Sequence, residues 1–240
     1  MKTDRLDKIL CGTGMYTRSA ARDLISGGLV AVDGIPVRRP ETRVSRASEL
    51  RVRGELLDTA EYVYCMMNKP AGYVSASKDE GGLPAVTGLL PEYLRRRGLQ
   101  CAGRLDVDVT GLLLLTDDGD YIHRVISPRS EISKVYEVLA DGPLTSEDAE
   151  RLARGVTLEN GTTYRPARLE TEDGDPRRVL VTVTEGKYHE VKNLIAYCGR
   201  RVLAMRRLAV GGLALDPALT PGAYRRLTER EIGLVLDKTV

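Results

Sequence analysis

The sequence contains no tryptophan and no phenylalanine, so its 11 tyrosines are the side chains available for stacking on a flat ligand. Histidine is also scarce: His123 and His189 are the two present, and neither lies at a metal-ligand spacing from other donors, which argues against a transition-metal enzyme. The four cysteines are far apart and include no C-x-x-C pair. This spacing argues against a disulfide framework or a zinc knuckle.

Several other signals are missing. No apolar run approaches the roughly 20 residues that cross a bilayer, and the first residues, MKTDRLDK, are too charged for a signal peptide. No glycine-rich phosphate loop and no G-x-S-x-G motif is present, so nucleotide cofactors and acyl transfer have no support. We expect a cytoplasmic protein that needs no cofactor and no metal and has no membrane partner.

The length of 240 residues exceeds the commonest size of one domain, which predicts two modules. The net charge of +2 is unevenly spread, because residues 1–60 hold 11 Lys and Arg against 8 Asp and Glu. The positive excess of the N-terminal part indicates either polyanion binding or an ordinary solvated surface.

The N-terminal part predicts a basic helix followed by a hairpin. Thr17 can cap a helix that runs to Ile25 and ends at Gly27 and Gly28. The turn signal Asp33-Gly34 then separates two short strands. The stretch RVSRASELRVRG predicts one further strand, and the polar segment 55–61 predicts a linker. We therefore place the modules at residues 1–60 and 61–240.

The second module combines short strands with helices. Six strands are predicted, at residues 62–67, 112–115, 134–139, 165–170, 178–184 and 201–210. Capping-box pairs at Thr145/Asp148 and Thr228/Glu231 predict two helix starts, and a third helix carries His189 and ends at Gly199. Asn160-Gly161 marks another hairpin. The pattern is typical of a mixed, largely antiparallel α+β fold.

The segment GRLDVDVTGLLLLTDDGD is the strongest candidate for chemistry. It places Asp106 and Asp108 directly before the apolar run Leu112–Leu115, at the edge of a buried strand. Two other interpretations remain open at this point. Five residues of this segment also fit a calcium-loop template, namely Asp106, Asp108, Thr110, Gly111 and Asp117, although its ninth and twelfth positions hold leucine and aspartate where a polar ligand and a glutamate are expected. Asp106 could also serve as a structural cap.

Two further segments carry candidate groups. Tyr136 lies in KVYEVLA, where it shares a strand face with Lys134, and it could be either a functional ring or a core aromatic. Lys192 follows His189 by three residues in EGKYHEVKN, so both can face one site, unless the lysine is solvated.

Taken together, GRLDVDVTGLLLLTDDG, the K-x-Y of Lys134 and Tyr136, and EGKYHEVK closely resemble the three signature motifs of RNA pseudouridine synthases of the RsuA type. RLDKIL with TRSAARDLISGGLVAVDG resembles the small RNA-binding module of the S-four type that this family carries at its N-terminus. The resemblance extends through MNKPAGYVSAS and the C-terminal PGAYRRLTEREI.

The resemblance implies a role for each matching residue. Asp106 is the catalytic aspartate, Tyr136 stacks on the target uracil, and Lys192 pairs with the aspartate. Arg104 would help to hold the flipped nucleotide. In the N-terminal module, the cations that would meet RNA phosphates are Arg5, Lys8, Arg18 and Arg22. The alternative for this module is a packing or dimerisation domain.

The leading hypothesis is an isomerase that converts one uridine of small-subunit (16S) ribosomal RNA to pseudouridine and acts as a monomer on ribosomal RNA or an assembly intermediate. The alternatives are a large-subunit enzyme and a non-catalytic ribosome-assembly factor. Two positions depart from the family pattern, since Glu190 and Asn193 stand where glutamine and a basic residue are common. Glu190 could face another base or share a proton with Asp106.

Overall fold

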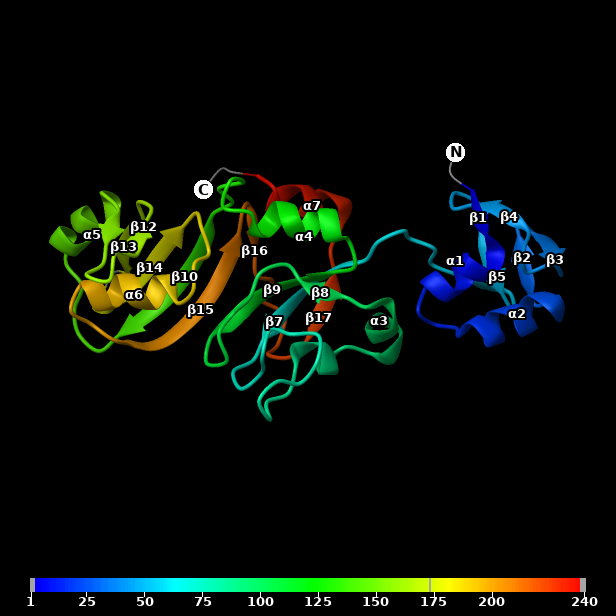
Figure 1. Ribbon diagram of the computed structural model, residues 1–240, viewed down its shortest axis with the longest axis horizontal. Coiled ribbons are helices and arrows are strands. Elements are labelled where there is room, and N and C mark those ends of the chain that lie inside the picture. The colour runs from blue at the N-terminus through cyan, green and yellow to red at the C-terminus, as the bar shows by residue number, and fades with distance from the viewer. Residues whose placement is uncertain (1–2, 173, 238–240) are drawn as a thin grey trace. The chain divides into compact units, whose positions relative to one another are not determined.

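The computed structural model describes residues 3–172 and 174–237 (Figure 1). The chain forms two compact units. The first comprises the residues up to Val63 together with Leu90–Leu99, and the second comprises Tyr64–Leu89 and the chain from Gln100 onward. Both units mix helices with mainly antiparallel sheets, which confirms the predicted α+β class. No helix in the described ranges is long and apolar enough to cross a membrane.

Unit 1 consists of short helices and strands. They are β1 (Thr3–Arg5), α1 (Leu6–Gly12), α2 (Arg18–Ser26), β2 (Val30–Val32), β3 (Ile35–Val37), β4 (Arg43–Ser45), β5 (Leu50–Val52), β6 (Glu55–Leu56) and α3 (Glu92–Arg97). The predicted helix start is confirmed, because the Thr17 hydroxyl accepts a hydrogen bond from the Ala20 amide at 3.2 Å. Gly27 is the C-cap of α2, as expected.

The sheets of unit 1 confirm one strand prediction and correct another. β2 and β3 form the expected antiparallel hairpin, and both turn residues have positive φ, 49° at Asp33 and 80° at Gly34. This backbone suits the right-handed twist of the two strands. Residues 43–54 were expected to form one strand but form two, because a turn after Ser45 sends β4 to β1 and β5 to β2. The expected linker also begins inside β6.

The core of unit 1 is the interior between its two first helices and its sheets. The apolar faces of α1 and α2 meet strand residues there, and the buried set is Leu6, Ile9, Leu10, Ala21, Leu24, Ile25, Val30, Val44, Leu50, Val52 and Leu57. The exposed faces of these helices carry Lys8 on α1 and Arg18 and Arg22 on α2. Burial of one stripe of each helix therefore presents the cations on the outside.

Unit 2 is built on one sheet. Its strands are β7 (Tyr64–Lys69), β8 (Gln100–Cys101), β9 (Thr110–Thr116), β10 (Lys134–Ala140), β13 (Arg168–Glu172), β14 (Asp175–Val183), β15 (Val202–Val210), β16 (Leu213–Ala214) and β17 (Tyr224–Arg226). The main order is β13-β14-β10-β15-β9-β7-β17. A separate hairpin joins β11 (Val156–Thr157) to β12 (Thr163–Tyr164) around the predicted Asn160-Gly161 turn. All six predicted strands are confirmed, with ends shifted by a few residues.

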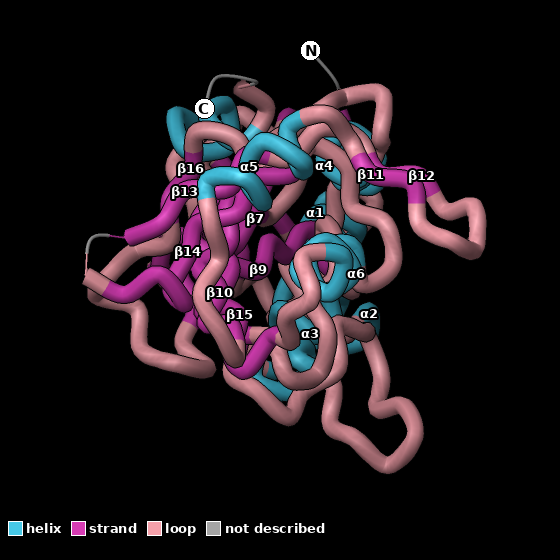
Figure 2. The backbone as a smooth tube through the Cα atoms, turned by 90° about the vertical axis from the view of Figure 1, so that its left-hand side faces the viewer, coloured by secondary structure: helices cyan, strands magenta, loops and turns pink. Residues whose placement is uncertain are grey.

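Helices cover the sheet of unit 2. They are η1 (Val86–Leu89), α4 (Gly119–Ile126), α5 (Ser146–Ala153), α6 (Glu190–Tyr197) and α7 (Glu229–Val235). Both predicted capping boxes are present, at the starts of α5 and α7. α5 packs on β13 and α6 on β15, while α4 and α7 lie side by side over the other half of the sheet (Figure 1). β10, β14 and β15 run next to one another in the second view (Figure 2).

The two halves of this sheet meet at a short parallel contact. β9 and β15 pair through Arg206 with Thr110 and Arg207 with Gly111, whereas all other strand pairs in the sheet are antiparallel. Gly111 has a φ of +103°, and a Cβ at this position would overlap the backbone of Arg207. The close approach of the two strands therefore requires glycine.

Gly111→Ala should lower the free energy of unfolding by more than about 3 kcal/mol, because the added methyl group separates β9 from β15 and the backbone conformation disfavours a side chain. Urea unfolding followed by circular dichroism measures the change. Gly161→Ala is the matched control, since Gly161 also has a positive φ but no atom lies within 4 Å of its Cβ position. Gly161→Ala should lower the free energy of unfolding by about 1 kcal/mol. An equal loss of stability in the two variants would contradict the steric argument for Gly111.

Candidate active site

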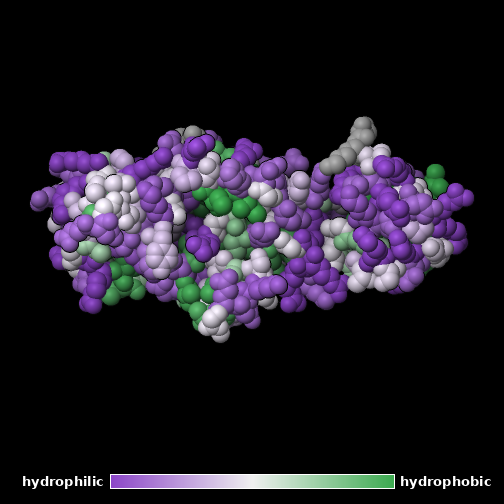
Figure 3. Space-filling model, in the orientation of Figure 1, coloured by the Kyte–Doolittle hydropathy of each residue, from purple (hydrophilic) through white to green (hydrophobic). Residues whose placement is uncertain are grey.

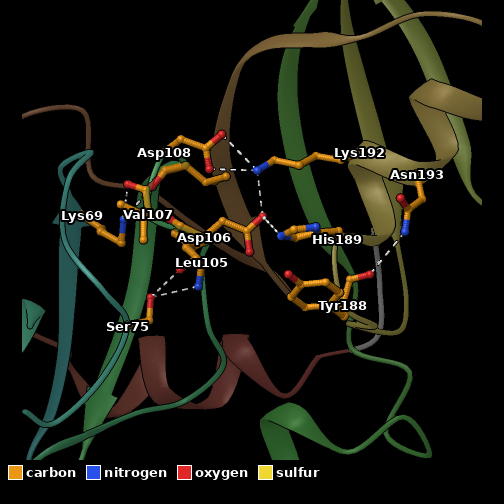
Figure 4. Close-up of polar contacts among 11 residues, drawn as sticks. Lys69, Ser75, Leu105, Asp106, Val107, Asp108, Tyr188, His189, Lys192 and Asn193 are labelled. Carbon is orange, nitrogen blue, oxygen red and sulfur yellow. Dashed lines mark hydrogen bonds and ion pairs between the residues drawn. The ribbon is translucent and has the colours of Figure 1, made fainter. Parts of the chain in front are cut away.

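The loop between β8 and β9 carries Asp106 and is held by side chains from another segment. The amide of Val109 donates to the carbonyl oxygen of Asp106 at 3.1 Å, which closes a turn just before β9. The Ser75 hydroxyl accepts from the Leu105 amide at 3.0 Å and donates to the Leu105 carbonyl oxygen at 2.8 Å (Figure 4). The backbone on both sides of Asp106 is thereby fixed.

Lys69 holds the same loop from inside the sheet. The residue is fully buried at the end of β7, and its Nζ donates to the carbonyl oxygens of Val109 at 2.9 Å, Asp106 at 3.0 Å and Pro70 at 3.1 Å. Burial lowers the pKa of Lys69 to about 8, although the charges of Asp108 and Asp106 oppose the shift. Neutral carbonyl dipoles thus take the place of a carboxylate partner for this ammonium.

Lys192 approaches the loop from α6. Its Nζ lies 3.0 Å from Oδ2 of Asp106 and 2.8 Å from Oδ1 of Asp108 (Figure 4). The expected pairing of Lys192 with the aspartate is therefore present, and Asp108 shares the same ammonium. Burial by itself lowers the pKa of Lys192, but hydrogen bonds and charge from the two aspartates outweigh it and raise the pKa.

His189 also contacts Asp106, although not from within the helix as expected. Its Nε2 lies 3.4 Å from Oδ2 of Asp106. His189 is the N-cap of α6 and has a φ of 53°, so the helix begins one residue later than predicted. The left-handed backbone turns His189 toward the loop and stacks its ring on Tyr188, with the centroids 3.8 Å apart. Tyr188 itself is 75% exposed.

A groove of about 640 Å³ lies in front of Asp106. Its lining combines apolar residues of α4 with charged and aromatic ones, and includes Arg104, Asp106, Ile122, Ile126, Tyr188 and His189. Figure 3 shows hydrophobic side chains exposed beside hydrophilic ones on this part of unit 2. Asp106 is 29% exposed, whereas Asp108 is 70% exposed. Asp106 is therefore the more enclosed of the two carboxylates that face Lys192.

The other two predicted site residues differ in their surroundings. Arg104 is exposed and lines the groove next to Asp106. Tyr136 is 8% exposed on β10, and its hydroxyl lies 3.5 Å from Nη1 of Arg207. Among the described residues, no hydrogen bond or ring contact links Tyr136 to Asp106 or Lys192. Asp106, Lys192 and Arg104 therefore gather at the groove, while Tyr136 lies within the sheet beside it.

Glu190 is buried near a second buried acid, Glu185. Its carboxylate accepts from the Lys187 amide at 3.1 Å, and its charge is coupled to those of Glu185 and Lys134. Burial, and then the charge of Glu185, raise the pKa of Glu190 to about 7. The hydrogen bond of Glu190 is thus to a backbone amide, and its carboxylate forms neither an ion pair with a basic side chain nor a contact with Asp106 among the described residues. Asn193 donates to the Tyr164 hydroxyl at 2.6 Å.

The calcium-loop alternative is excluded by the position of the leucines. Leu112–Leu115 form the buried centre of β9, whereas the template would place them in an exposed loop. Within residues 3–172 and 174–237, no group of three or more His, Cys, Asp or Glu is arranged to hold a metal ion.

The four predicted RNA-binding cations of unit 1 line one pocket of about 310 Å³. Asp7 lies among them and is nearly buried, with Oδ2 2.9 Å from Nη2 of Arg5 and 3.4 Å from Nε of Arg22. A hydrogen bond from Arg5 is the main cause of the lowered pKa of Asp7. Lys8 pairs with Asp4, at 2.9 Å. Arg18 has no ion-pair partner in the described part of the chain.

Sequence reasoning did not assign Lys69, Ser75 or the Asp108 contact. A lysine that ends the apolar run CMMNK is a signal for Lys69, since a lysine in a buried strand needs partners. Two of its carbonyl partners, those of Asp106 and Val109, come from the loop near residue 106, which only the fold brings to β7.

The comparisons with known proteins agree with this arrangement. The family described as RNA pseudouridylate synthase matches residues 63–197, and the S4 domain matches residues 4–50. The chain belongs to the RNA pseudouridylate synthase family. It is therefore an isomerase that converts uridine to pseudouridine in RNA, with an RNA-binding S4 domain at its N-terminal end. This confirms the resemblance drawn from the three motifs.

Individual relatives match nearly the full chain. The ribosomal small subunit pseudouridine synthase A of Escherichia coli is 40% identical over 234 residues, which cover 97% of this chain and 100% of the relative. The uncharacterized RNA pseudouridine synthase YtzG of Bacillus subtilis is 41% identical over 234 residues, which cover 96% of this chain and 98% of the relative. A crystal structure of a pseudouridylate synthase superposes with a TM-score of 0.68 at 36% identity, over 96% of this chain and 99% of that one.

Glu190→Gln should stabilise the protein above pH 7 and have little effect near pH 4.5. Because the folded state raises the pKa of Glu190 to about 7, its stabilising contribution is complete below about 4.5 and is lost as pH rises through 7. The variant should gain up to about 3 kcal/mol over the wild type at pH 8. Urea unfolding at pH 5, 6, 7 and 8 measures the difference.

Glu159→Gln provides the control, since Glu159 is exposed. The difference in free energy of unfolding between Glu159→Gln and the wild type should stay constant over the same pH range. A flat difference for Glu190→Gln as well would show that its carboxylate remains ionised in the folded protein.

Proposed function

We propose that the protein converts a specific uridine of small-subunit (16S) ribosomal RNA to pseudouridine, with Asp106 as the catalytic carboxylate. The observation that carries this proposal is the contact between Asp106 and Lys192 at the groove, at 3.0 Å. The small-subunit substrate is supported by full-length similarity to the small-subunit enzyme of Escherichia coli. A large-subunit substrate is the second candidate, and the same assay distinguishes the two.

The reaction breaks the bond between ribose C1′ and uracil N1 and joins C1′ to C5. It exchanges nothing with the medium except protons, so it requires no cofactor. The Asp106 carboxylate can attack C1′ or remove a proton from the sugar, and either role needs the ionised form. The Lys192 ammonium lies 3.0 Å from Oδ2 of Asp106 and forms an ion pair with the carboxylate. The groove keeps the detached uracil close to the ribose.

The target nucleotide has to leave its stack before Asp106 can reach the sugar, at a cost of a few kcal/mol. In this proposal the Tyr136 ring carries the uracil, since stacking on an aromatic ring returns about 1 to 3 kcal/mol per base. Arg104, exposed at the groove, holds the flipped nucleotide through its phosphate.

The pocket of unit 1 serves as a phosphate clamp in this proposal. Arg18 is the cation with the fewest competing contacts, while Arg5 and Arg22 share Asp7. We assign residues 1–60 to the RNA-binding module and residues 61–240 to the catalytic domain. The protein acts as a monomer in the cytoplasm, on ribosomal RNA or an assembly intermediate.

Tritium release from C5-labelled uridine tests the proposed reaction. The wild type should release tritium from small-subunit RNA and not from large-subunit RNA, and Asp106→Asn should lower the rate at least about 10³-fold because the amide can neither attack nor accept a proton. RNA affinity, measured by filter binding, should persist in the variant.

Asp108→Asn is the matched variant, because Asp108 contacts the same ammonium at 2.8 Å but is mostly exposed. It should weaken turnover by about tenfold at most. Tritium release by Asp106→Asn would overturn the assignment of Asp106 as the catalytic carboxylate. A larger loss of the release rate in Asp108→Asn than in Asp106→Asn would overturn it as well. Release from large-subunit RNA alone would favour the second candidate substrate.

Charge reversal of Arg18 and Arg22 to Glu should weaken RNA binding and reduce its salt dependence. Each lost phosphate contact lowers the slope of log affinity against log salt by about 0.7 to 0.9. Filter binding between 50 and 200 mM salt measures both effects.

Charge reversal of Arg38 and Arg39 is the control, since both lie outside the pocket and the net charge changes equally. The control should weaken binding much less. Equal losses in both double variants would mean that net charge, and not the pocket, governs affinity.

A further inference from the structure

Arg207 is a buried cation that the described acidic side chains do not neutralise. It lies on β15 with 2% of its surface exposed, and its Nε donates to the carbonyl oxygen of Leu112 at 2.8 Å. Its Nη2 is buried and has no hydrogen-bond partner among the described residues. An arginine stays charged at physiological pH, and an unpaired buried donor costs free energy. A group of this kind is a candidate for function.

The guanidinium lies between Tyr136 and the wall of the groove. Its central carbon is 6.0 Å from the centroid of the Tyr136 ring, on the neighbouring strand β10 (Figure 2). On the other side, a Cβ at Gly103 would lie 4.0 Å from Nη1, and Gly103 lines the groove. The charge of Arg207 is therefore separated from the groove by one backbone segment.

Two more buried cations share this part of the sheet. Lys69 is fully buried and Lys134 is 8% exposed. Burial, together with a smaller contribution from the charge of Arg207, lowers the pKa of each to about 8. Carbonyl oxygens are the hydrogen-bond acceptors of both ammonium groups in the described structure. The sheet behind the groove thus carries positive charge in a region of low dielectric constant.

The isomerisation passes through a state in which such charge is useful. When the C1′–N1 bond breaks, its electron pair stays on the uracil. C1′ then either bonds to the Asp106 oxygen or forms a double bond to C2′ after Asp106 removes the C2′ proton. In both cases the detached uracil is an anion, with charge on N1 and the carbonyl oxygens. The charge disappears when C5 bonds to C1′. In the first case the bond from C1′ to the Asp106 oxygen breaks and the carboxylate leaves, and in the second Asp106 returns its proton to C2′. Loss of the C5 proton and protonation of N1 then restore the ring.

We propose that Arg207 is a positioning residue whose charge stabilises the detached uracil anion while the ring lies on Tyr136. This inference rests on the proposed role of Tyr136 as the stacking ring. A preorganised charge aimed at the place where charge develops lowers the barrier without reorganisation. The weak 3.5 Å contact with the Tyr136 hydroxyl also keeps that ring in place. The hydrogen bond to Leu112 orients the guanidinium.

The test compares Arg207→Lys with Arg207→Met, since the two introduced side chains are similar in length and differ in charge. Arg207→Met should lower the single-turnover rate of tritium release by on the order of 10²-fold, whereas Arg207→Lys should retain most of the rate at pH 7. RNA affinity should change by no more than about threefold in either variant, because the charge acts on the reacting state.

The pH profile of Arg207→Lys provides a readout that a purely structural role would not affect. A buried amine loses its proton as pH rises, so the rate of Arg207→Lys relative to the wild type should fall between about pH 7 and 9.5. This measurement also keeps the proposal testable if Arg207→Met fails to fold. Arg206→Met is the control, because Arg206 precedes Arg207 on β15, points to the other face and is only partly buried.

Equal rates for Arg207→Lys and Arg207→Met at equal melting temperature would overturn the proposal, as would a flat rate ratio across the pH range. Asp106→Asn is measured on the same RNA. If Asp106→Asn still turns over, the proposed function fails. If it is inert while the two Arg207 variants are equal, only this inference fails.

Discussion

The Lys192 ammonium, held between two carboxylates, is the contact on which the site depends. It connects α6 with the loop before β9, and these segments lie more than 80 residues apart in the chain. The carboxylate of Asp106 would be costly to enclose at a partly apolar groove without an adjacent cation. Lys69 fixes the backbone of the same loop from the opposite side. Side chain and backbone of Asp106 are thus each held by a lysine, one near the surface and one fully buried.

Unit 2 carries several buried charges whose contribution to stability is unfavourable. Lys69, Lys134 and Arg207 lack a carboxylate hydrogen-bond partner within the described residues, and Glu190 retains a raised pKa next to Glu185. A sheet filled with apolar residues would be easier to stabilise. Their concentration behind one groove fits a site in which charge develops during the reaction, since enzymes commonly trade stability for such preorganised charge.

Unit 1 shows how a small basic module can limit its own attraction to anions. Three of the four cations of its pocket are paired with Asp7 or Asp4, which leaves Arg18 as the one without an acidic partner in the described structure. Acids within a basic surface reduce non-specific attraction but keep the cations in defined positions. RNA would have to compete with Asp7 for Arg5 and Arg22, so binding there should depend on the geometry of the phosphates as well as on charge.

Short stretches of the chain were enough to specify the local elements and to identify the motifs. Capping residues such as Thr17 and Thr145 and the turn at Asp33 marked helix starts and a hairpin correctly, because these signals act within a few residues. The same local signals missed the turn that divides residues 43–54 into two strands. The contact of Lys69 with the loop of Asp106, the proximity of Glu190 to Glu185 and the position of Arg207 beside Tyr136 depend on the folded chain. Those contacts join residues far apart in the chain, and their strength comes from burial, which no short stretch of sequence contains.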